Sequence, residues 1–589
     1  MKIIAVVLLL GSLSLRSASA DPEISSWFTA ESTKYARVQT SQTASPTGTV
    51  TWTYQTSPVY AGIQEVAYDT NYVYARSYGM AGYVMGPWYL DAAKTQPFPN
   101  WPEARTNIWR FTRTPTVAAT KSLTTLGEIG MYVNGVSLFD NRDGYVWTGS
   151  GDSGNGTGYW WRDAWVNEHV TFDSGYAHQQ QTGDYHYHAY PPALRYQLGD
   201  NITLSNGVYV EDTSNLKHSP ILAWVADGFP LYGPYGYSDP TNANSGVRRM
   251  VSGYVLRDGQ NGTDNLTATG RTTIPAWAQR AYNVSAYQTG PNVSTNYPLG
   301  RYLEDNAYLG DLTNSLTGQP YQQGVDFDLN EYNARWCVTP EYPNGTWAYF
   351  CTITSTNSPA FPYAVGRQFL GTPYTTTLTA IPTNATTVFK GGPDTTETMA
   401  SPAVSNDDVT IAWNSVEGGT YTLQASGDLS SSNNWTALST NIAADVGTVT
   451  AVVETGGGTN SQRFYRVART SLAPFWPAAG STGGGGIDAG ISSVSPTSGD
   501  AGQDVTLTIT LDSSYVPPPP PDMIQPTGAT LTGPTTITAT SATRDTSTGI
   551  VTATFDLTGK PPGTYTVNVI FNTPNGVLTL SNTYGFTVN

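Results

Sequence analysis

The chain has 589 residues, and its 39% hydrophobic and 12% aromatic content is enough for packed cores, which excludes global disorder. Its 28 basic and 44 acidic side chains give a formal charge of −16. This charge makes nucleic acid and anionic membrane surfaces poor partners, whereas calcium or a neutral glycan is not disfavoured.

The first twenty residues have the pattern of an export signal. Lys2 supplies a positive charge, residues 3–15 form an apolar run, and residues 18–20 give a small-residue cleavage site. The apolar run is shorter than the ~18 residues of a membrane-spanning helix, and no later stretch approaches that length. We therefore expect cleavage after Ala20, a secreted or extracellular protein, and no membrane span.

The mature chain is predicted to be mainly β. Few residues are charged, while Gly, Thr, Ser, Asn and Tyr are abundant, which is typical of short strands joined by turns. Residues 41–371 form a large first domain that holds every histidine and both cysteines. We expect strands in this domain at 72–74, 131–133, 208–211 and 347–354, and one short helical segment at 161–166.

All five histidines of the chain fall between positions 169 and 218, and two of them alternate with tyrosines at positions 185–188. Successive side chains on a strand point to opposite faces, so His186 and His188 share one face and Tyr185 and Tyr187 the other. Two imidazoles on one strand face can reach the same metal ion, and imidazole is the commonest side-chain metal ligand. The pattern indicates a metal site here.

Several motifs follow one another along this domain. They are the segment 131–136; Asp173, His178 and the block 183–188, followed by Pro191 and Leu194; the segments 218–222 and 227–236; and the segments 339–346 and 361–363. In this order, the motifs resemble those of the YHYH-domain family of secreted bacterial proteins. The resemblance implies a fold but no activity. It places His178, His186, His188 and His218 in the family's motif blocks and leaves His169 outside them.

We therefore predict that His178, His186, His188 and His218 converge on one transition metal ion. Nitrogen ligands suit zinc, copper or iron and do not distinguish among them. Under the alternative interpretation, the imidazoles are hydrogen-bonded within an aromatic core and serve only to stiffen the fold.

Two further groups of residues are candidates for additional ligands or for hydrogen-bond partners of the ligands. The carboxylates are Asp173, Asp184 and Asp227, and the phenols are Tyr185 and Tyr187. Asp184 follows Gly183 and fits a turn better than a site, whereas Asp227, before Gly228, fits either role.

The two cysteines, Cys337 and Cys351, flank a segment that contains the turn signal Asn344-Gly345. In an exported protein, this arrangement predicts a disulfide across a hairpin. A zinc site is the weaker interpretation, because two cysteines do not complete a tetrahedral site and no histidine is near in sequence.

Two small β-modules are predicted after the first domain. Alternating segments in residues 400–470 indicate a sandwich of fibronectin type III or immunoglobulin character. Residues 471–486 form a glycine-rich flexible linker, and residues 487–589 begin like the immunoglobulin-like IPT/TIG domains. A proline run at 517–521 predicts an exposed polyproline II loop. Such modules suit a cell-surface or glycan partner.

Two classes of function remain open from the sequence. In one, the histidines hold a metal that activates water or dioxygen in a metalloenzyme. In the other, the protein is a non-catalytic extracellular binding or adhesion protein whose histidines are structural. The sequence has no phosphate-binding glycine loop, no His-Glu-x-x-His motif and no Gly-x-Ser-x-Gly motif, so ATP-dependent and serine-hydrolase chemistry lack support.

Overall fold

The computed structural model describes residues 21–38, 59–472 and 491–589, apart from short gaps at 155, 206–207, 406, 431–433, 445–448, 512–525, 533–534, 546–549 and 574–575. The predicted export signal, most of the predicted linker and the proline run at 517–521 therefore lie outside the described residues.

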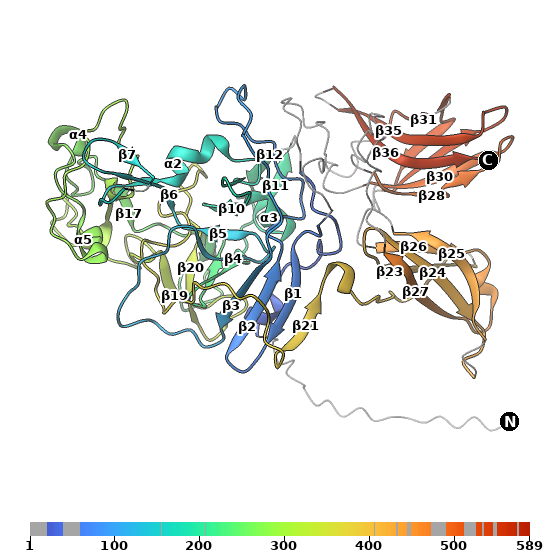
Figure 1. Ribbon diagram of the computed structural model, residues 1–589, viewed down its shortest axis with the longest axis horizontal. Helices are drawn as coiled ribbons and strands as arrows, with labels where there is room; N and C mark the ends of the chain where they lie inside the picture. The colour runs from blue at the N-terminus through green and yellow to red at the C-terminus, as the bar shows by residue number, and fades with distance from the viewer. Residues whose placement is uncertain are drawn as a thin grey trace.

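The described residues are built mainly of β-strands in several small sheets, which confirms the predicted fold class (Figure 1). The largest sheet has eight strands in the order β19-β20-β14-β13-β4-β5-β10-β9. They are β4 (Glu128–Tyr132), β5 (Ser137–Phe139), β9 (Ala177–Gln179), β10 (Tyr185–Tyr187), β13 (Ile221–Val225), β14 (Pro230–Tyr232), β19 (Ala334–Cys337) and β20 (Thr346–Phe350).

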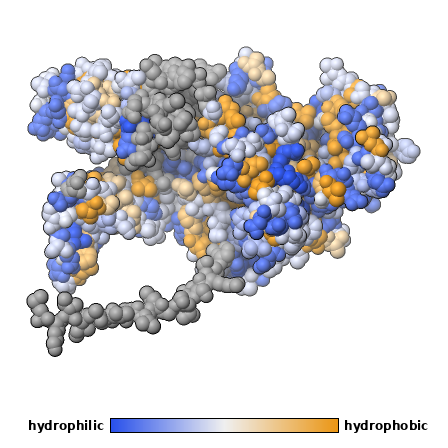
Figure 2. Space-filling model, turned by 180° about the vertical axis from the view of Figure 1, so that it is seen from behind, coloured by the Kyte–Doolittle hydropathy of each residue, from blue (hydrophilic) through white to orange (hydrophobic). Residues whose placement is uncertain are grey.

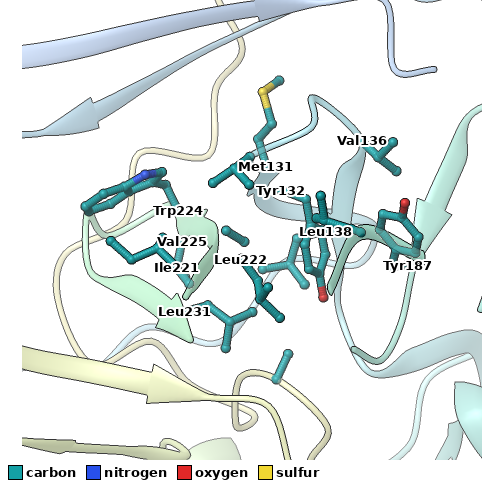
Figure 3. Close-up of a cluster of buried hydrophobic side chains, with 14 of the residues drawn as sticks. Met131, Tyr132, Val136, Leu138, Tyr187, Ile221, Leu222, Trp224, Val225 and Leu231 are labelled. Carbon is teal, nitrogen blue, oxygen red and sulfur yellow. The ribbon is translucent and has the colours of Figure 1, made fainter. Parts of the chain in front are cut away.

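The centre of this sheet is buried on both faces. Every residue of β13 is buried, as expected for an apolar run covered on two sides. Figure 3 shows Met131, Leu222, Trp224 and Leu231 gathered around this strand, with Tyr187 of β10 at one side of the cluster. The apolar packing thus fixes the sheet on which β9 and β10 lie at one edge.

A second sheet, in the order β21-β1-β2-β3, packs beside the first. It contains β1 (Ile63–Tyr68), β2 (Tyr72–Ser77), β3 (Asn107–Thr112) and β21 (Thr386–Lys390). Strand β21 pairs antiparallel with β1, with Glu65 opposite Lys390, so the sheet includes a strand beyond residue 371.

Four smaller sheets and several short helices complete this part of the chain. The sheets join β6 (Arg142–Trp147) to β7 (Asp152–Ser153) and β8 (Trp161–Asp163), β11 (Ile202–Ser205) to β12 (Val208–Glu211), β15 (Tyr235–Tyr237) to β16 (Val247–Arg249), and β17 (Tyr254–Leu256) to β18 (Asn306–Tyr308). The α-helices are α1 (Pro22–Ser25), α2 (Ala164–Glu168), α3 (Pro192–Gln197), α4 (Leu266–Thr269) and α5 (Ala276–Tyr282). Single 3₁₀ turns are η1 (His169–Thr171), η2 (Leu303–Asp305), η3 (Leu309–Asp311), η4 (Gly392–Asp394) and η5 (Gly457–Thr459).

Both C-terminal regions form sandwich-like pairs of sheets. The first pairs β22 (Ala403–Ser405), β23 (Asp408–Asn414) and β26 (Val449–Glu454) with β24 (Gly419–Ser426), β25 (Thr436–Ala443) and β27 (Phe464–Leu472). The second pairs β28 (Ile491–Ser495), β30 (Asp504–Leu511), β33 (Ser541–Arg544) and β34 (Val551–Asp556) with β29 (Ser498–Gly499), β31 (Gly528–Thr532), β32 (Thr536–Thr538), β35 (Gly563–Thr573) and β36 (Gly576–Val588). Alternate residues of β23 and β30 are buried, which is the pattern of a strand with one face in a core.

The first sandwich contacts the N-terminal segment through Glu417. This side chain is buried, and its carboxylate accepts hydrogen bonds from the backbone N–H of Tyr35 at 2.7 Å and from Arg37 at 2.6 Å. The hydroxyl of Tyr60 donates to the backbone carbonyl of Glu417 at 2.9 Å. The two regions are thus joined by buried polar contacts as well as by the chain.

In the part of the chain that the structure describes, none of the helices is both long enough and apolar enough to cross a bilayer. Figure 2 shows hydrophobic residues in small patches between hydrophilic ones on the visible face.

The predicted disulfide is wrong, because Cys337 and Cys351 are both free and buried. The hairpin of β19 and β20 does form, but Cys337 lies opposite Thr346, while Cys351 follows the far end of β20. Five residues of extended chain separate positions 346 and 351, which corresponds to about 16 Å. A disulfide needs Cα atoms within about 7 Å, so the register of the hairpin keeps the thiols apart.

We expect neither thiol to react with an alkylating reagent in the folded protein and both to react after unfolding without reductant. Burial raises the pKa of both thiols, and their relative exposure is 0%. Intact mass after alkylation, with and without denaturant, measures this directly. Recovery of fewer than two thiols from the unfolded, unreduced protein would contradict the structure.

Candidate metal centre

The β9–β10 hairpin brings three histidines together. His178 of β9 lies directly opposite His186 of β10 in the antiparallel register. His188 follows two residues after His186 and therefore points to the same face of the strand. On its other side, β10 pairs in parallel with β5, with His186 opposite Ser137, so the hairpin is fixed to the large sheet.

The three imidazoles converge through their Nε2 atoms. The Nε2 of His186 lies 3.1 Å from that of His178 and 3.1 Å from that of His188. One nitrogen of each histidine lies within 4.8 Å of the others, and the three side chains are buried. The expected N···N separation around a tetrahedral metal with bonds of ~2.0–2.1 Å is about 3.3 Å. The observed spacing fits such a site.

The other ring nitrogens fix the tautomer of all three histidines. The Nδ1 of His186 lies 2.9 Å from the carbonyl of Asp184, and that of His188 lies 2.8 Å from the carbonyl of Asp140. A carbonyl only accepts, so both Nδ1 atoms must carry the proton. Because this places the proton on Nδ1, each neutral ring presents a bare Nε2 lone pair to the centre.

His178 has the same tautomer for a different reason. Its Nδ1 lies 2.7 Å from the hydroxyl of Thr171, and that hydroxyl donates its proton to the carbonyl of Glu168 at 2.7 Å. The Thr171 oxygen is therefore the acceptor, and the Nδ1 of His178 is the donor.

Burial also favours the neutral form of these histidines. Burial, the largest cause, lowers the pKa of His188 to about 4 and holds the pKa of His178 and of His186 well below the usual value. Three neutral rings with lone pairs facing one another repel unless a cation lies between them.

The structure adds Glu168, a residue that sequence reasoning missed. One carboxylate oxygen of Glu168 lies 3.4 Å from the Nε2 of His188 and 3.7 Å from that of His178. Glu168 is the last residue of α2, which Asp163 caps by accepting a hydrogen bond from the N–H of Val166 at 3.0 Å. Only its position shortly before His178 could have indicated it in the sequence.

Phenyl rings surround the imidazoles. Phe139 stacks on His186 with ring centroids 3.7 Å apart, and Phe172 contacts His178 at 4.7 Å. Phe98 lies 5.9 Å from His178 on another side. The relative exposure of His178, His186 and His188 is 5%, 2% and 3%, whereas the side chain of Glu168 retains 25%. Glu168 is therefore the most exposed of the four side chains.

His218 does not join this group. Its Nδ1 lies 2.8 Å from the carbonyl of Ser219, and its ring contacts Tyr232 at 5.2 Å and Tyr237 at 4.8 Å. Its ring contacts Tyr232 of β14 and Phe350 of β20, which pair in the half of the large sheet away from β9 and β10. His169 also stands apart, as an exposed residue whose Nδ1 bonds the carbonyl of Trp165.

The three aspartates take different positions. Asp184 contributes its backbone carbonyl to His186, and Gly183, with φ of +84°, forms the turn before it. The Asp227 carboxylate accepts bonds from the Tyr349 hydroxyl at 2.7 Å and the Gly371 N–H at 2.8 Å, so it braces a turn away from the histidines. The Asp173 carboxylate lies with the tyrosines on the other face of β10.

Tyr185 and Tyr187 point away from the imidazoles, as the strand alternation predicts. The hydroxyl of Tyr83 lies 2.9 Å from that of Tyr185 and 2.6 Å from that of Tyr187. The Tyr185 hydroxyl donates to Asp173 at 2.7 Å. These phenols are therefore not ligands of the group formed by the three histidines.

The fold and the site together define a mostly β protein with a buried three-histidine centre on one hairpin of a mixed sheet. Residues 108–362 match the family described as YHYH protein, and this part of the chain is a YHYH domain. The three histidines, Glu168 and His218 all lie within the matched residues, and both C-terminal modules lie outside them. A search of curated proteins finds no match to the chain.

Proposed function

We propose that the YHYH domain binds one transition metal ion through the Nε2 atoms of His178, His186 and His188. The observation that carries the proposal is the convergence of three bare lone pairs, each fixed by a donor bond from the opposite ring nitrogen. One proton could relieve the repulsion between only two of the rings. A metal ion satisfies all three at once.

Glu168 is proposed as the oxygen donor of the same site. Its carboxylate lies near two of the three nitrogens and is the only one of the four groups with substantial exposure. Three imidazoles and one carboxylate suit zinc, copper or iron, whereas calcium prefers a shell of oxygen atoms. A ligand from solvent would reach the ion from the side of Glu168.

The metal content of purified protein tests this proposal. We expect about one ion per chain in protein purified without a metal-affinity column, and almost none in His186→Ala, because two remaining imidazoles and a carboxylate hold a metal far more weakly. Elemental analysis by mass spectrometry gives both the stoichiometry and the identity of the ion.

Three further variants make the measurement specific. His169→Ala removes an exposed histidine and His218→Ala removes one outside the group, so both should retain the metal, whereas Glu168→Gln should retain less than the wild type. Equal metal content in wild type and His186→Ala, or none in either after dialysis against zinc, copper and iron, would reject the proposal and favour histidines that are only structural.

We further propose that the protein acts outside the cell and that the two C-terminal modules attach it to an extracellular partner such as a glycan. The pattern of residues 1–20 supports export. The modules lack histidine and cysteine, and their excess of acidic over basic residues within an acidic chain argues against nucleic acid.

A further inference from the structure

Behind the histidines, on the opposite face of β10, the structure holds a connected chain of three phenols and one carboxylate. It comprises Tyr83, Tyr185, Tyr187 and Asp173, and the hydroxyls are joined at 2.6–2.9 Å. Tyr185, Tyr187 and Asp173 are buried at 1%, 0% and 5% relative exposure. Metal binding by the histidines does not require this chain.

The number of available protons fixes which hydroxyl donates in each hydrogen bond of this series. A phenol has one proton to donate, and Tyr185 gives its proton to the Oδ2 atom of Asp173. Tyr83 must then donate to Tyr185, and Tyr187 must donate to Tyr83. The Tyr187 oxygen in turn accepts the side-chain N–H of Asn134 at 3.1 Å. Every proton in the chain therefore points toward Asp173.

Asp173 accepts the last hydrogen bond of this series, and backbone N–H groups fix its carboxylate. Its Oδ2 also accepts the N–H of Gly86 at 2.8 Å, and its Oδ1 accepts the N–H groups of Gly175 at 2.8 Å and Ala177 at 3.3 Å. These fixed backbone donors orient the carboxylate toward the Tyr185 hydroxyl. Oxidation of a phenol makes it strongly acidic, so a tyrosine that loses an electron needs such a proton acceptor.

The phenols are also close to the histidine group through the backbone. Tyr185 and Tyr187 flank His186 directly, and consecutive Cα atoms lie only ~3.8 Å apart. The rings of Tyr185 and Tyr187 contact each other, with their centroids 5.9 Å apart. The route from the Tyr185 ring to a metal on His186 would run through the two side chains and the peptide bond that joins them.

The surroundings of the histidines restrict what could react with the metal. The imidazoles are almost fully buried, and Phe98, Phe139 and Phe172 contact their rings. These phenyl rings leave little room for a large substrate beside the imidazoles. Small oxygen species such as hydrogen peroxide are the class that fits.

We propose that Tyr185 is a redox-active tyrosine that donates one electron to a redox-active metal centre during reduction of peroxide. This inference rests on the proposed metal site and narrows its ion to iron or copper. Hydrogen peroxide takes one electron from the metal and one from Tyr185, and with two protons from solvent it forms two water molecules. The phenolic O–H bond of Tyr185 breaks, its proton moves to Asp173, and a neutral phenoxyl radical remains.

The test is electron paramagnetic resonance of the full-length protein loaded with iron(II) and frozen after mixing with hydrogen peroxide. We expect an organic radical signal whose splitting collapses when the protein contains ring-deuterated tyrosine. Tyr185→Phe should lose most of this signal at unchanged metal content. Protein loaded with zinc should give no signal, since zinc does not supply the second electron.

Two variants control for loss of structure. Tyr132→Phe also removes a buried hydroxyl, which donates to the carbonyl of Ala189 at 3.1 Å, and it should keep the radical. Asp173→Asn keeps all phenols but removes the proton acceptor, and it should give a weaker signal. If wild-type protein with bound iron or copper gives no tyrosyl signal, or if Tyr185→Phe gives an equal signal, the redox role of Tyr185 is overturned and the proposed metal binding is not. If the protein binds no metal, the proposed function is overturned, and the redox role of Tyr185 with it.

Discussion

Chelation of the metal is expected to lower the melting temperature of the wild-type protein. A ligand that binds only the folded state stabilises it by RT ln(1 + [M]/Kd), which is about 4.1 kcal/mol when the free ion is at 1,000 times its Kd. For a domain of 150–250 residues, each kcal/mol corresponds to about 2–4 °C, and the shift is smaller for a larger domain such as this one. Without the ion, the three buried lone pairs also face one another unscreened.

Differential scanning calorimetry with and without a chelator measures this shift, and His186→Ala is the decisive comparison. That variant should melt at the same temperature under both conditions, because it has no ion to lose. His169→Ala should show the wild-type shift. An identical melting temperature for wild-type protein with and without chelator, at confirmed metal occupancy, would argue against a metal that supports the fold.

Arg195→Ala is expected to destabilise the protein by about 3–5 kcal/mol, the range for breaking a buried ion pair from one side. Arg195 has 0% relative exposure, and its Nε donates to Asp200 at 2.5 Å. The rest of its guanidinium bonds both carboxylate oxygens of Glu211. Removing the cation leaves two buried carboxylates without their counter-charge.

Arg280→Ala is the matched control, since Arg280 also bonds two carboxylates, Asp311 and Glu331. Its side chain is 46% exposed, so the loss should be at most about 1 kcal/mol. Urea unfolding monitored by tryptophan fluorescence gives both values. A similar small loss for the two variants would show that the Arg195 cluster is not a buried ion-pair network.

The local part of the site could be predicted from the sequence. Alternation on a strand is a short-range rule, so His186 and His188 on one face and Tyr185 and Tyr187 on the other follow from the four letters alone. The structure confirms both placements through the His186–His188 contact and the Tyr185–Tyr83 bond. Strand-rich regions and the hairpin at Asn344-Gly345 follow from similarly local signals.

What failed in the sequence analysis depended on register and on long-range pairing. The disulfide required Cys337 and Cys351 to lie opposite each other, but the hairpin places Thr346 opposite Cys337. His218 shares the domain with the other histidines, yet β13 and β14 carry it to another part of the sheet. Glu168 reaches the site because α2 ends beside the hairpin, and apart from its position shortly before His178 nothing in the sequence indicates it.

Under the proposed function, the hairpin itself has a consequence for how the protein would acquire its ion. All three histidines lie between positions 178 and 188, and the pairing of β9 with β10 places two of them opposite each other. Closing so short a loop takes far less time than ordering a sheet built from distant strands, and hairpins form in ~1–10 μs. With the proposed site, the folding chain could therefore bind its ion before the eight-stranded sheet is complete, and the ion would then hold the β9–β10 hairpin in register at the edge of that sheet.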